Sequence, residues 1–250
     1  MSFTIALAGK GGTGKTTMAG LLIRYMLGKG LKPILAVDAD ANANLNEVLG
    51  VTYENTVGDA REEMKKGGLE GMTKDIFMDM RIQQALVEAE GFDLIVMGRP
   101  EGQGCYCAAN NLLSEIIDKL THNYRYLVVD NEAGMEHISR LTTRHIDVLL
   151  IVSDGSRRGL QAAIRIGELV QELGLTVMKK FVIVNQVEKK EDAQWETWDQ
   201  LLGANDLIFL GVVPKDDRIY EFDKEGKPTF NLPETSPAVQ TAFQLFEKVF

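Results

Sequence analysis

A glycine-rich segment near the start of the sequence carries residues suited to binding phosphate. Residues 9–16 read GKGGTGKT, which fits the pattern G-x-x-x-x-G-K-[ST]. Glycines allow backbone N–H groups to turn toward phosphate oxygens. Lys15 would place a cation on the β- and γ-phosphates, and Thr16 would offer a hydroxyl to Mg²⁺. The residues expected to contact a nucleotide here are Gly11, Gly12, Thr13, Gly14, Lys15, Thr16 and Thr17.

Carboxylates follow two of the apolar runs in the sequence. Asp38 and Asp40 come directly after one run, and Asp130 ends another. Because the carboxyl ends of parallel strands border the crevice where ligands bind, these side chains should approach the phosphates. Asp38 and Asp130 could hold water ligands of Mg²⁺, and Asp40 could orient or deprotonate an attacking water. The competing interpretation is that Asp38 and Asp40 only form turns and helix caps, which aspartate favours.

The two cysteines of the sequence, Cys105 and Cys107, lie one residue apart in a glycine-rich segment. Two thiolates at this spacing can bind one soft or borderline metal ion. A tetrahedral site usually has four ligands, and the simplest completion is a second copy of the chain across a two-fold axis. The pair therefore predicts a homodimer with a shared four-cysteine site. The competing interpretation is that both cysteines are small buried hydrophobic residues.

Short apolar runs alternate with longer amphipathic stretches, and these elements must position the candidate residues. The expected strands are Phe3–Ala8, Pro33–Val37, Phe92–Met97, Tyr126–Asp130, Val148–Val152, Phe181–Val184 and Ile208–Val213. The expected helices are Lys15–Leu27, Met72–Glu90, Ala108–Leu120, Leu160–Leu173, Asp192–Leu202 and Pro237–Phe250. The alternation predicts an α/β fold with a mostly parallel sheet of seven to eight strands and helices on both faces. No linker divides the sequence, so residues 1–250 should form a single domain.

Composition excludes several classes of protein. The 27 Lys+Arg against 36 Asp+Glu give a net charge of −9, which disfavours nucleic-acid and acidic-membrane partners. The 45% hydrophobic content is enough for a packed core, so dominant disorder is excluded. Neither a signal peptide nor an apolar run long enough to span a membrane is visible. We therefore expect a cytoplasmic protein in which free thiols survive.

The phosphate-binding segment, with its additional lysine Lys10, resembles the deviant Walker A motif of the MinD/ParA-type ATPases. The resemblance implies ATP/ADP and Mg²⁺ as cofactors, with Lys10 reaching the partner subunit's phosphates in a nucleotide-sandwich dimer. It also makes Asp40 the water-activating residue of switch I, with Asp38 on the magnesium side. Gly134, four residues after Asp130, would sense the γ-phosphate in switch II.

The same resemblance makes Asn185 and Pro214 contacts of the adenine ring. Asn185 is followed by Gln186 and Val187, so the base-reading motif of GTPases is absent and ATP is favoured over GTP.

The nucleotide motifs together with the C-x-C pair resemble one branch of this family, the nickel-insertion ATPases of the CooC type that mature carbon monoxide dehydrogenase. This resemblance implies that ATP drives dimerisation and that Cys105 and Cys107 of two subunits bind Ni²⁺ or Zn²⁺. Apo carbon monoxide dehydrogenase would be the client. Three alternatives remain: an ATPase that matures acetyl-CoA synthase, a MinD/ParA-like switch, and an electron-transfer ATPase like the nitrogenase iron protein.

Overall fold

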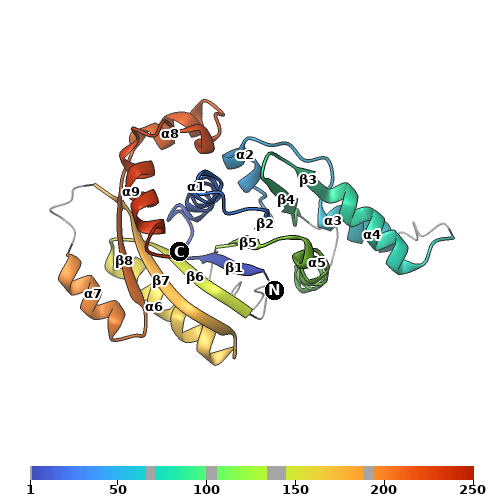
Figure 1. Cartoon of the computed structure of the whole chain (residues 1–250). Coiled ribbons are helices and arrows are strands. Elements are labelled where there is room, and N and C mark those ends of the chain that lie inside the picture. Colours follow the sequence, from blue (N-terminus) through green and yellow to red (C-terminus); the bar gives the residue numbers. More distant parts are fainter. Residues whose placement is uncertain (1, 66–70, 100–105, 134–144, 189–193) are drawn as a thin grey trace.

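The computed structural model describes residues 2–65, 71–99, 106–133, 145–188 and 194–250. Within them, the side chains of residues 64, 65, 74, 75 and 106–111 are outside the description. Figure 1 shows the chain arranged around one central sheet.

Eight strands of the described residues form that sheet in the order β3-β4-β2-β5-β1-β6-β7-β8. The strands are β1 (Phe3–Ala8), β2 (Ile34–Ala39), β3 (Leu86–Glu88), β4 (Phe92–Val96), β5 (Tyr126–Asn131), β6 (His145–Asp154), β7 (Thr176–Val187) and β8 (Ile208–Pro214). Only β3 in this set is antiparallel to its neighbour. The expected mostly parallel α/β sheet is therefore confirmed.

Helices cover both faces of the sheet, as expected for parallel strands that are apolar on both sides. The described helices are α1 (Lys15–Gly28), α2 (Leu45–Leu49), α3 (Val57–Lys65), α4 (Lys74–Ala85), α5 (Tyr106–Leu120), α6 (Arg157–Glu172), α7 (Trp195–Gly203), α8 (Asp217–Lys224) and α9 (Pro237–Phe246). Two short 3₁₀ segments, η1 (Thr121–Asn123) and η4 (Thr229–Asn231), complete the described elements.

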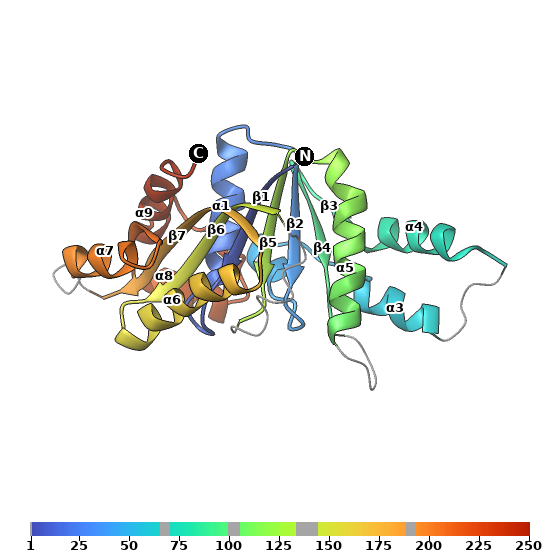
Figure 2. The ribbon, with the colours of Figure 1, turned by 90° about the horizontal axis from the view of Figure 1, so that it is seen from below.

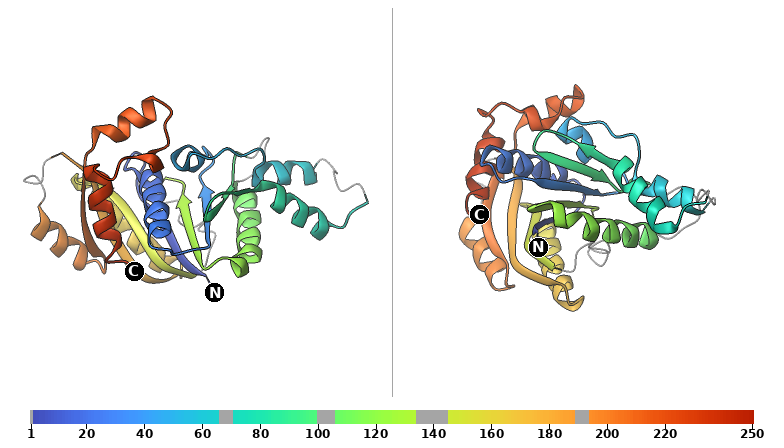
Figure 3. Two further views of the ribbon diagram at one scale, coloured as in Figure 1. Left: turned by 45° about the horizontal axis from the view of Figure 1, so that its top comes forward. Right: turned by 45° about the vertical axis from the view of Figure 1, so that its right-hand side comes forward.

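Two large buried clusters of the described residues, and a smaller third one around Trp198 of α7, hold the layers together. On one face α1, α2 and α9 pack against the sheet through residues such as Leu22 and Phe246. Helices α1 and α9 lie side by side there (Figures 1 and 3). On the other face α5 and α6 pack through residues such as Ile117 and Ile166. Helices α3 and α4 extend beyond the β3 edge of the sheet (Figure 2).

The expected helix Met72–Glu90 is wrong over its last part. Helix α4 ends at Ala85, and Leu86–Glu88 forms the short strand β3 paired antiparallel to β4. Gly91, with φ of 87°, closes the turn between the two strands. A hairpin with β4 gives this edge segment backbone hydrogen-bond partners that helical periodicity could not reveal.

The structure also departs from the expected elements at other places. Strands β6 and β7 are several residues longer at both ends than the apolar runs that predicted them. Helix α8 was not expected, because its eight residues are too few for a helical repeat to be recognised, although Ile219 and Phe222 pack against the core. None of the described helices combines the length and apolar character needed to cross a membrane.

Candidate nucleotide-binding site

The glycine-rich loop joins the carboxyl end of β1 directly to the first turn of α1. Its cap residue, Gly14, has φ of 88° and provides no side chain to bond the first N–H groups of the helix. Within the loop, the hydroxyl of Thr13 donates to the carbonyl oxygen of Lys10 at 2.9 Å. A helix amino terminus combines unbonded N–H groups with the positive end of the helix dipole. The loop is therefore shaped to receive an anion such as a phosphate.

Two consecutive amide side chains at the end of β7 hold this loop in place. Nδ2 of Asn185 donates to the carbonyl oxygen of Thr13 at 2.8 Å, and Nε2 of Gln186 donates to that of Gly12 at 3.2 Å. The contact leaves no room for a side chain at Gly14, since a Cβ there would lie 2.5 Å from Nδ2 of Asn185. Backbone from β1 and side chains from β7 thus fix the loop before any ligand binds.

Lys15 lies in the centre of the site with only 7% of its surface exposed. Its ammonium group is 3.5 Å from the carbonyl oxygen of Lys10. Burial lowers the pKa of Lys15, while the charges of Asp130 and Asp40 act in the opposite direction. A buried cation with so few contacts is a strong electrostatic partner for phosphate oxygens.

Two buried carboxylates face the loop from adjacent strands. Asp38 of β2 and Asp130 of β5 are direct partners in the parallel register, and their side chains are 0% and 1% exposed. Burial raises the pKa of Asp130 to about 7 despite a hydrogen bond from Thr16, and the neighbouring Asp38 raises it further. Burial likewise raises the pKa of Asp38 to about 6.

These residues fit a magnesium ion. Among the described residues, Oδ1 of Asp130 is buried without a hydrogen-bond partner. The side chain of Thr16 forms a hydrogen bond with the same carboxyl group. Two carboxylates and a hydroxyl are the hard oxygen donors that Mg²⁺ prefers, directly or through water. A divalent cation would also offset the burial of two adjacent negative charges.

Asp38 also has the turn-forming role that the competing interpretation of the sequence gave it. Its Oδ1 accepts from the backbone N–H of Asp40 at 3.1 Å, and its Oδ2 accepts from that of Leu45 at 2.9 Å. Asp40 is itself half-buried, and its Oδ1 accepts from the N–H of Asn42 at 2.8 Å. The carboxylate of Asp38 therefore anchors both ends of the loop that carries Asp40, in agreement with the turn-forming interpretation.

The remaining predicted residues fall in three groups. Lys10 is exposed, and its reach to a partner subunit stays a prediction. Pro214 ends β8 beside β7. The N–H of the next residue, Lys215, donates to the carbonyl oxygen of Val187 in β7 at 3.0 Å. The contact of Pro214 with adenine, and that of Asn185, stay predictions.

Gly134 and Cys105 lie outside the described residues, and Cys107 lies in the first turn of α5 with its side chain outside the description. No group of three or more His, Cys, Asp or Glu residues suited to a metal ion occurs within the described ranges. The predicted cysteine site therefore stays a prediction.

Sequence reasoning missed two residues that support the site. One is Gln186, whose type and position beside Asn185 at a strand end were the available signal. The other is Asn131, which donates from Nδ2 to the carbonyl oxygen of Leu7 at 2.8 Å and so ties the end of β5 to β1. Both donate to backbone carbonyl groups that are distant in the sequence, so a local pattern could not identify these partners.

Comparison with known proteins agrees with this geometry. The family model for the CobQ/CobB/MinD/ParA nucleotide binding domain matches residues 4–230. The chain belongs to this family. It is an ATPase of the MinD/ParA family, with the single-domain α/β fold of MinD-type P-loop proteins.

Three relatives are informative. An uncharacterized ATP-binding protein of Methanocaldococcus jannaschii is 43% identical over 250 residues, which cover 98% of this chain and 97% of the relative. The carbon monoxide dehydrogenase accessory protein CooC of Rhodospirillum rubrum is 32% identical over 250 residues, covering 94% and 90%. The solved structure of MinD from Pyrococcus horikoshii, complexed with Mg-ADP, matches with a TM-score of 0.74 and 26% identity, covering 100% and 96%.

Proposed function

We propose that this family ATPase is a metallochaperone that dimerises with ATP and holds Ni²⁺ or Zn²⁺ through Cys105 and Cys107 of two subunits. ATP hydrolysis then opens the dimer and supports nickel insertion into apo carbon monoxide dehydrogenase. The observation that carries the proposal is the C-x-C pair, which contains both cysteines of the chain, in a relative of CooC.

The connection that carries the cysteines starts beside the nucleotide site. The N–H of Met97, just after β4, donates to the backbone carbonyl oxygen of Asp38 at 2.8 Å. The next residue, Gly98, packs closely on Thr56: a Cβ on Gly98 would lie 2.5 Å from the side chain of Thr56. The chain therefore leaves the sheet directly next to the loop of Asp40. A change in that loop with nucleotide state has a short physical route to the cysteine-bearing segment.

Each residue of the proposed hydrolytic site has a separate task. Lys15, Thr16 and the loop amides bind the phosphates, and Asp130 and Asp38 provide oxygens on the magnesium side. Bound Mg²⁺ would neutralise charge on the phosphate oxygens. Asp40 orients the attacking water, and the exposed ammonium of Lys10 reaches the phosphates of the partner subunit. Asn185 and Pro214 contact the adenine.

Shared use of one dimer couples the two ligands. If metal and ATP both favour the closed dimer, each must raise the affinity of the other by the same factor. Hydrolysis removes the contacts of the γ-phosphate and thereby weakens the four-cysteine site. Metal release thus follows from the loss of ATP, with no need for a separate trigger within the chain.

The test is a titration of the anaerobic, reduced protein with Ni²⁺ or Zn²⁺, in the presence and absence of ATP and Mg²⁺, followed by light scattering to measure mass. We expect one ion per two chains and tighter binding with ATP. Because the chain has two cysteines, reaction with a thiol reagent should report two free thiols per chain without metal and none with it. Cys105→Ser and Cys107→Ser should abolish stoichiometric binding, whereas His122→Ala, which removes an exposed alternative ligand, should not.

Two results would contradict the proposal. One is stoichiometric nickel binding by the Cys105→Ser protein, and the other is a mass that stays monomeric under every nucleotide and metal condition. Adding the loaded protein to apo carbon monoxide dehydrogenase and, in parallel, to apo acetyl-CoA synthase then identifies the client. If only acetyl-CoA synthase is activated, that enzyme is the client, and the proposed metal site is unaffected by the result.

A second candidate function is a MinD-like switch without a metal cargo. It is favoured by the likeness to Pyrococcus horikoshii MinD, which extends over the whole chain. This candidate predicts ATP-dependent dimerisation that is unaffected by Cys105→Ser and by a chelator that removes Ni²⁺ and Zn²⁺ but leaves Mg²⁺ in solution. The metallochaperone predicts that both reduce the dimer fraction.

A further inference from the structure

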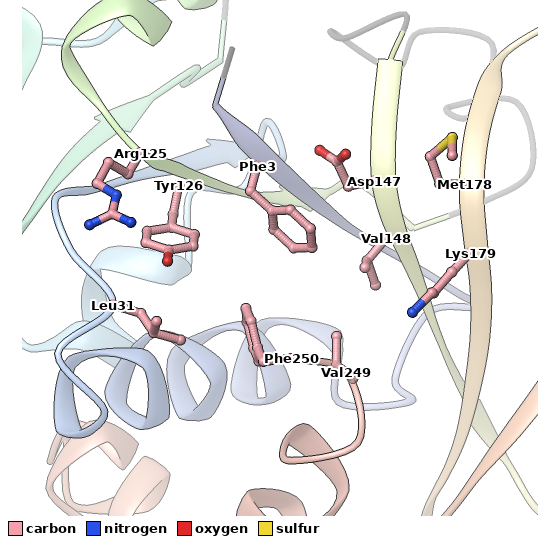
Figure 4. Close-up of a pocket in the computed structure, with 10 residues that line it drawn as sticks. All are labelled: Phe3, Leu31, Arg125, Tyr126, Asp147, Val148, Met178, Lys179, Val249 and Phe250. Carbon is pink, nitrogen blue, oxygen red and sulfur yellow. The ribbon is translucent and has the colours of Figure 1, made fainter.

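A cavity of about 690 Å³ opens at the amino-terminal end of the strands (Figure 4). The first residues of β1 and β5, Phe3 and Tyr126, line it together with Val148 of β6. Leu31, after α1, and Phe250, after α9, line its opposite side. The glycine-rich loop follows the other end of β1, so the cavity and the nucleotide site lie at opposite ends of the same strand.

Aromatic rings dominate the cavity. The rings of Phe3 and Tyr126 meet edge to face with centroids 6.3 Å apart, and those of Phe3 and Phe250 lie 6.0 Å apart. Phe250 is 45% exposed and Met178, which also lines the cavity, is 67% exposed. Figure 4 shows the three rings grouped around one hollow. Apolar surface of this kind gains free energy when a ligand removes it from water.

One cationic side chain lies on each side of this aromatic group. Figure 4 shows Arg125 beyond Tyr126 and Lys179 beyond Val148. Within the described part of the chain neither takes part in an ion pair, and the guanidinium of Arg125 lies over the Tyr126 ring at 5.8 Å. The side chains of Arg125 and Lys179 are both exposed, so either can pair with an anion at the cavity.

The one acidic residue of the cavity is already engaged. Oδ2 of Asp147 accepts from the backbone N–H of Thr4 at 2.7 Å, and its Oδ1 lies 3.6 Å from Nε2 of His145. Its carboxylate therefore interacts with the backbone of β1 and with His145 of its own strand, β6. The side chains that line the cavity thus carry two positive charges against one negative charge, around an aromatic interior.

We propose that this cavity binds a small organic acid whose apolar, ring-sized body contacts the aromatic group and whose carboxylate pairs with Arg125 or Lys179. The volume lies within the range of about 300–1,000 Å³ that is usual for small-molecule sites. Charge-assisted pairing supplies orientation, and ring burial supplies most of the affinity. A dimer that closes over the glycine-rich loops leaves this opposite end of the strands accessible.

Calorimetric titration with naphthalene-2-carboxylate tests the proposal in the full chain saturated with Mg-ADP, so that the nucleotide site is occupied. We expect saturable one-to-one binding, and roughly tenfold weaker binding of the neutral naphthalene-2-carboxamide. Arg125→Gln and Lys179→Gln together should weaken carboxylate binding by roughly tenfold or more but leave the carboxamide unaffected. Leu31→Trp should block both ligands by filling the cavity.

The controls are Arg165→Gln on α6 and Lys224→Gln on α8, two exposed cations away from the cavity, which should leave binding unchanged. Equal affinity for carboxylate and carboxamide would overturn the proposal, as would undiminished binding in the Leu31→Trp protein with an unchanged melting temperature. Competition of the probe with ADP would also overturn it by placing the probe in the nucleotide site. Binding of an acidic aromatic peptide without binding of the free acid would assign the surface to a polypeptide instead.

Discussion

The buried carboxyl group of Asp130 should make the stability of the nucleotide-free protein depend on pH, and Asp130→Asn should remove most of that dependence. The side chain is 1% exposed, and Oδ1 has no hydrogen-bond partner among the described residues. Burial raises its pKa from 3.8 to about 7, with Asp38 adding to the shift. The folded protein therefore keeps a proton that the unfolded chain loses in mild acid.

The sign and size follow from this difference. Between pH about 4 and about 7 the folded state binds more protons than the unfolded state, so the free energy of unfolding falls as pH rises. The shift of about 3 pKa units, at about 1.4 kcal/mol each, corresponds to about 4 kcal/mol once pH is well above 7. About 2–3 kcal/mol of that loss falls between pH 5 and pH 8. Asp38, with its pKa near 6, adds about 1–2 kcal/mol in the same interval.

Urea unfolding in the presence of a chelator, at pH values from 5 to 8, measures this dependence. The wild-type protein should lose about 4 kcal/mol over the interval, and Asp130→Asn should lose only the contribution of about 1–2 kcal/mol from Asp38. The asparagine amide changes the absolute stability at every pH, because its N–H groups need buried partners, but it does not titrate. The control Asp199→Asn, an exposed site on α7, should reproduce the wild-type slope. An Asp130→Asn protein with the wild-type slope would refute the assignment of the proton to this carboxyl group.

Three further predictions concern the loop and the nucleotide. Gly14→Ala should prevent ATP binding and lower the free energy of unfolding by about 2 kcal/mol or more, because the added Cβ would lie 2.5 Å from Asn185 at a positive φ. Equilibrium binding and urea unfolding measure the two effects, and a normal ATP affinity would contradict the contact. Asn185→Ala should cost about 1–2 kcal/mol of stability and raise the KM for ATP, as the buried carbonyl of Thr13 loses its donor; an unchanged KM and midpoint would contradict this. Lys10→Gln should retain ATP binding but lose ATP-dependent dimerisation measured by light scattering, with Lys224→Gln as the matched control; a normal dimer would remove Lys10 from the interface.

Most of the nucleotide site could be predicted from the sequence because its signals are local. The glycine-rich loop, the strand before it and the helix after it are contiguous, so their types and spacing define both structure and chemistry. Asp130 was also accessible, since an apolar strand that ends in aspartate positions the carboxylate at the ligand edge. The expected strand pattern then placed Asp38 and Asp130 at the same edge, and the register pairs them directly.

The features that escaped prediction depend on contacts between distant segments. Leu86–Glu88 becomes a strand only because β4 offers it backbone partners, and its helical neighbours gave no hint of this. Asn185 was expected to read the base, whereas the structure also uses its amide to hold Thr13 across 172 residues of sequence. Such support depends on how the ends of β7 and β1 meet, which only the folded sheet determines.

The anchoring by Asp38 limits where a nucleotide-dependent change can occur. Its side chain accepts from the N–H groups of Asp40 and Leu45, and its backbone carbonyl accepts from Met97. With so many contacts the residue is fixed, so we expect any change that depends on the γ-phosphate in the segment between these two N–H groups. Ala43, in that segment, has φ of 53°, an unfavourable value for a residue with a side chain. A loop fixed at both ends and strained between them can change conformation locally. Because Met97 bonds the same Asp38, such a change lies next to the connection that carries the cysteines.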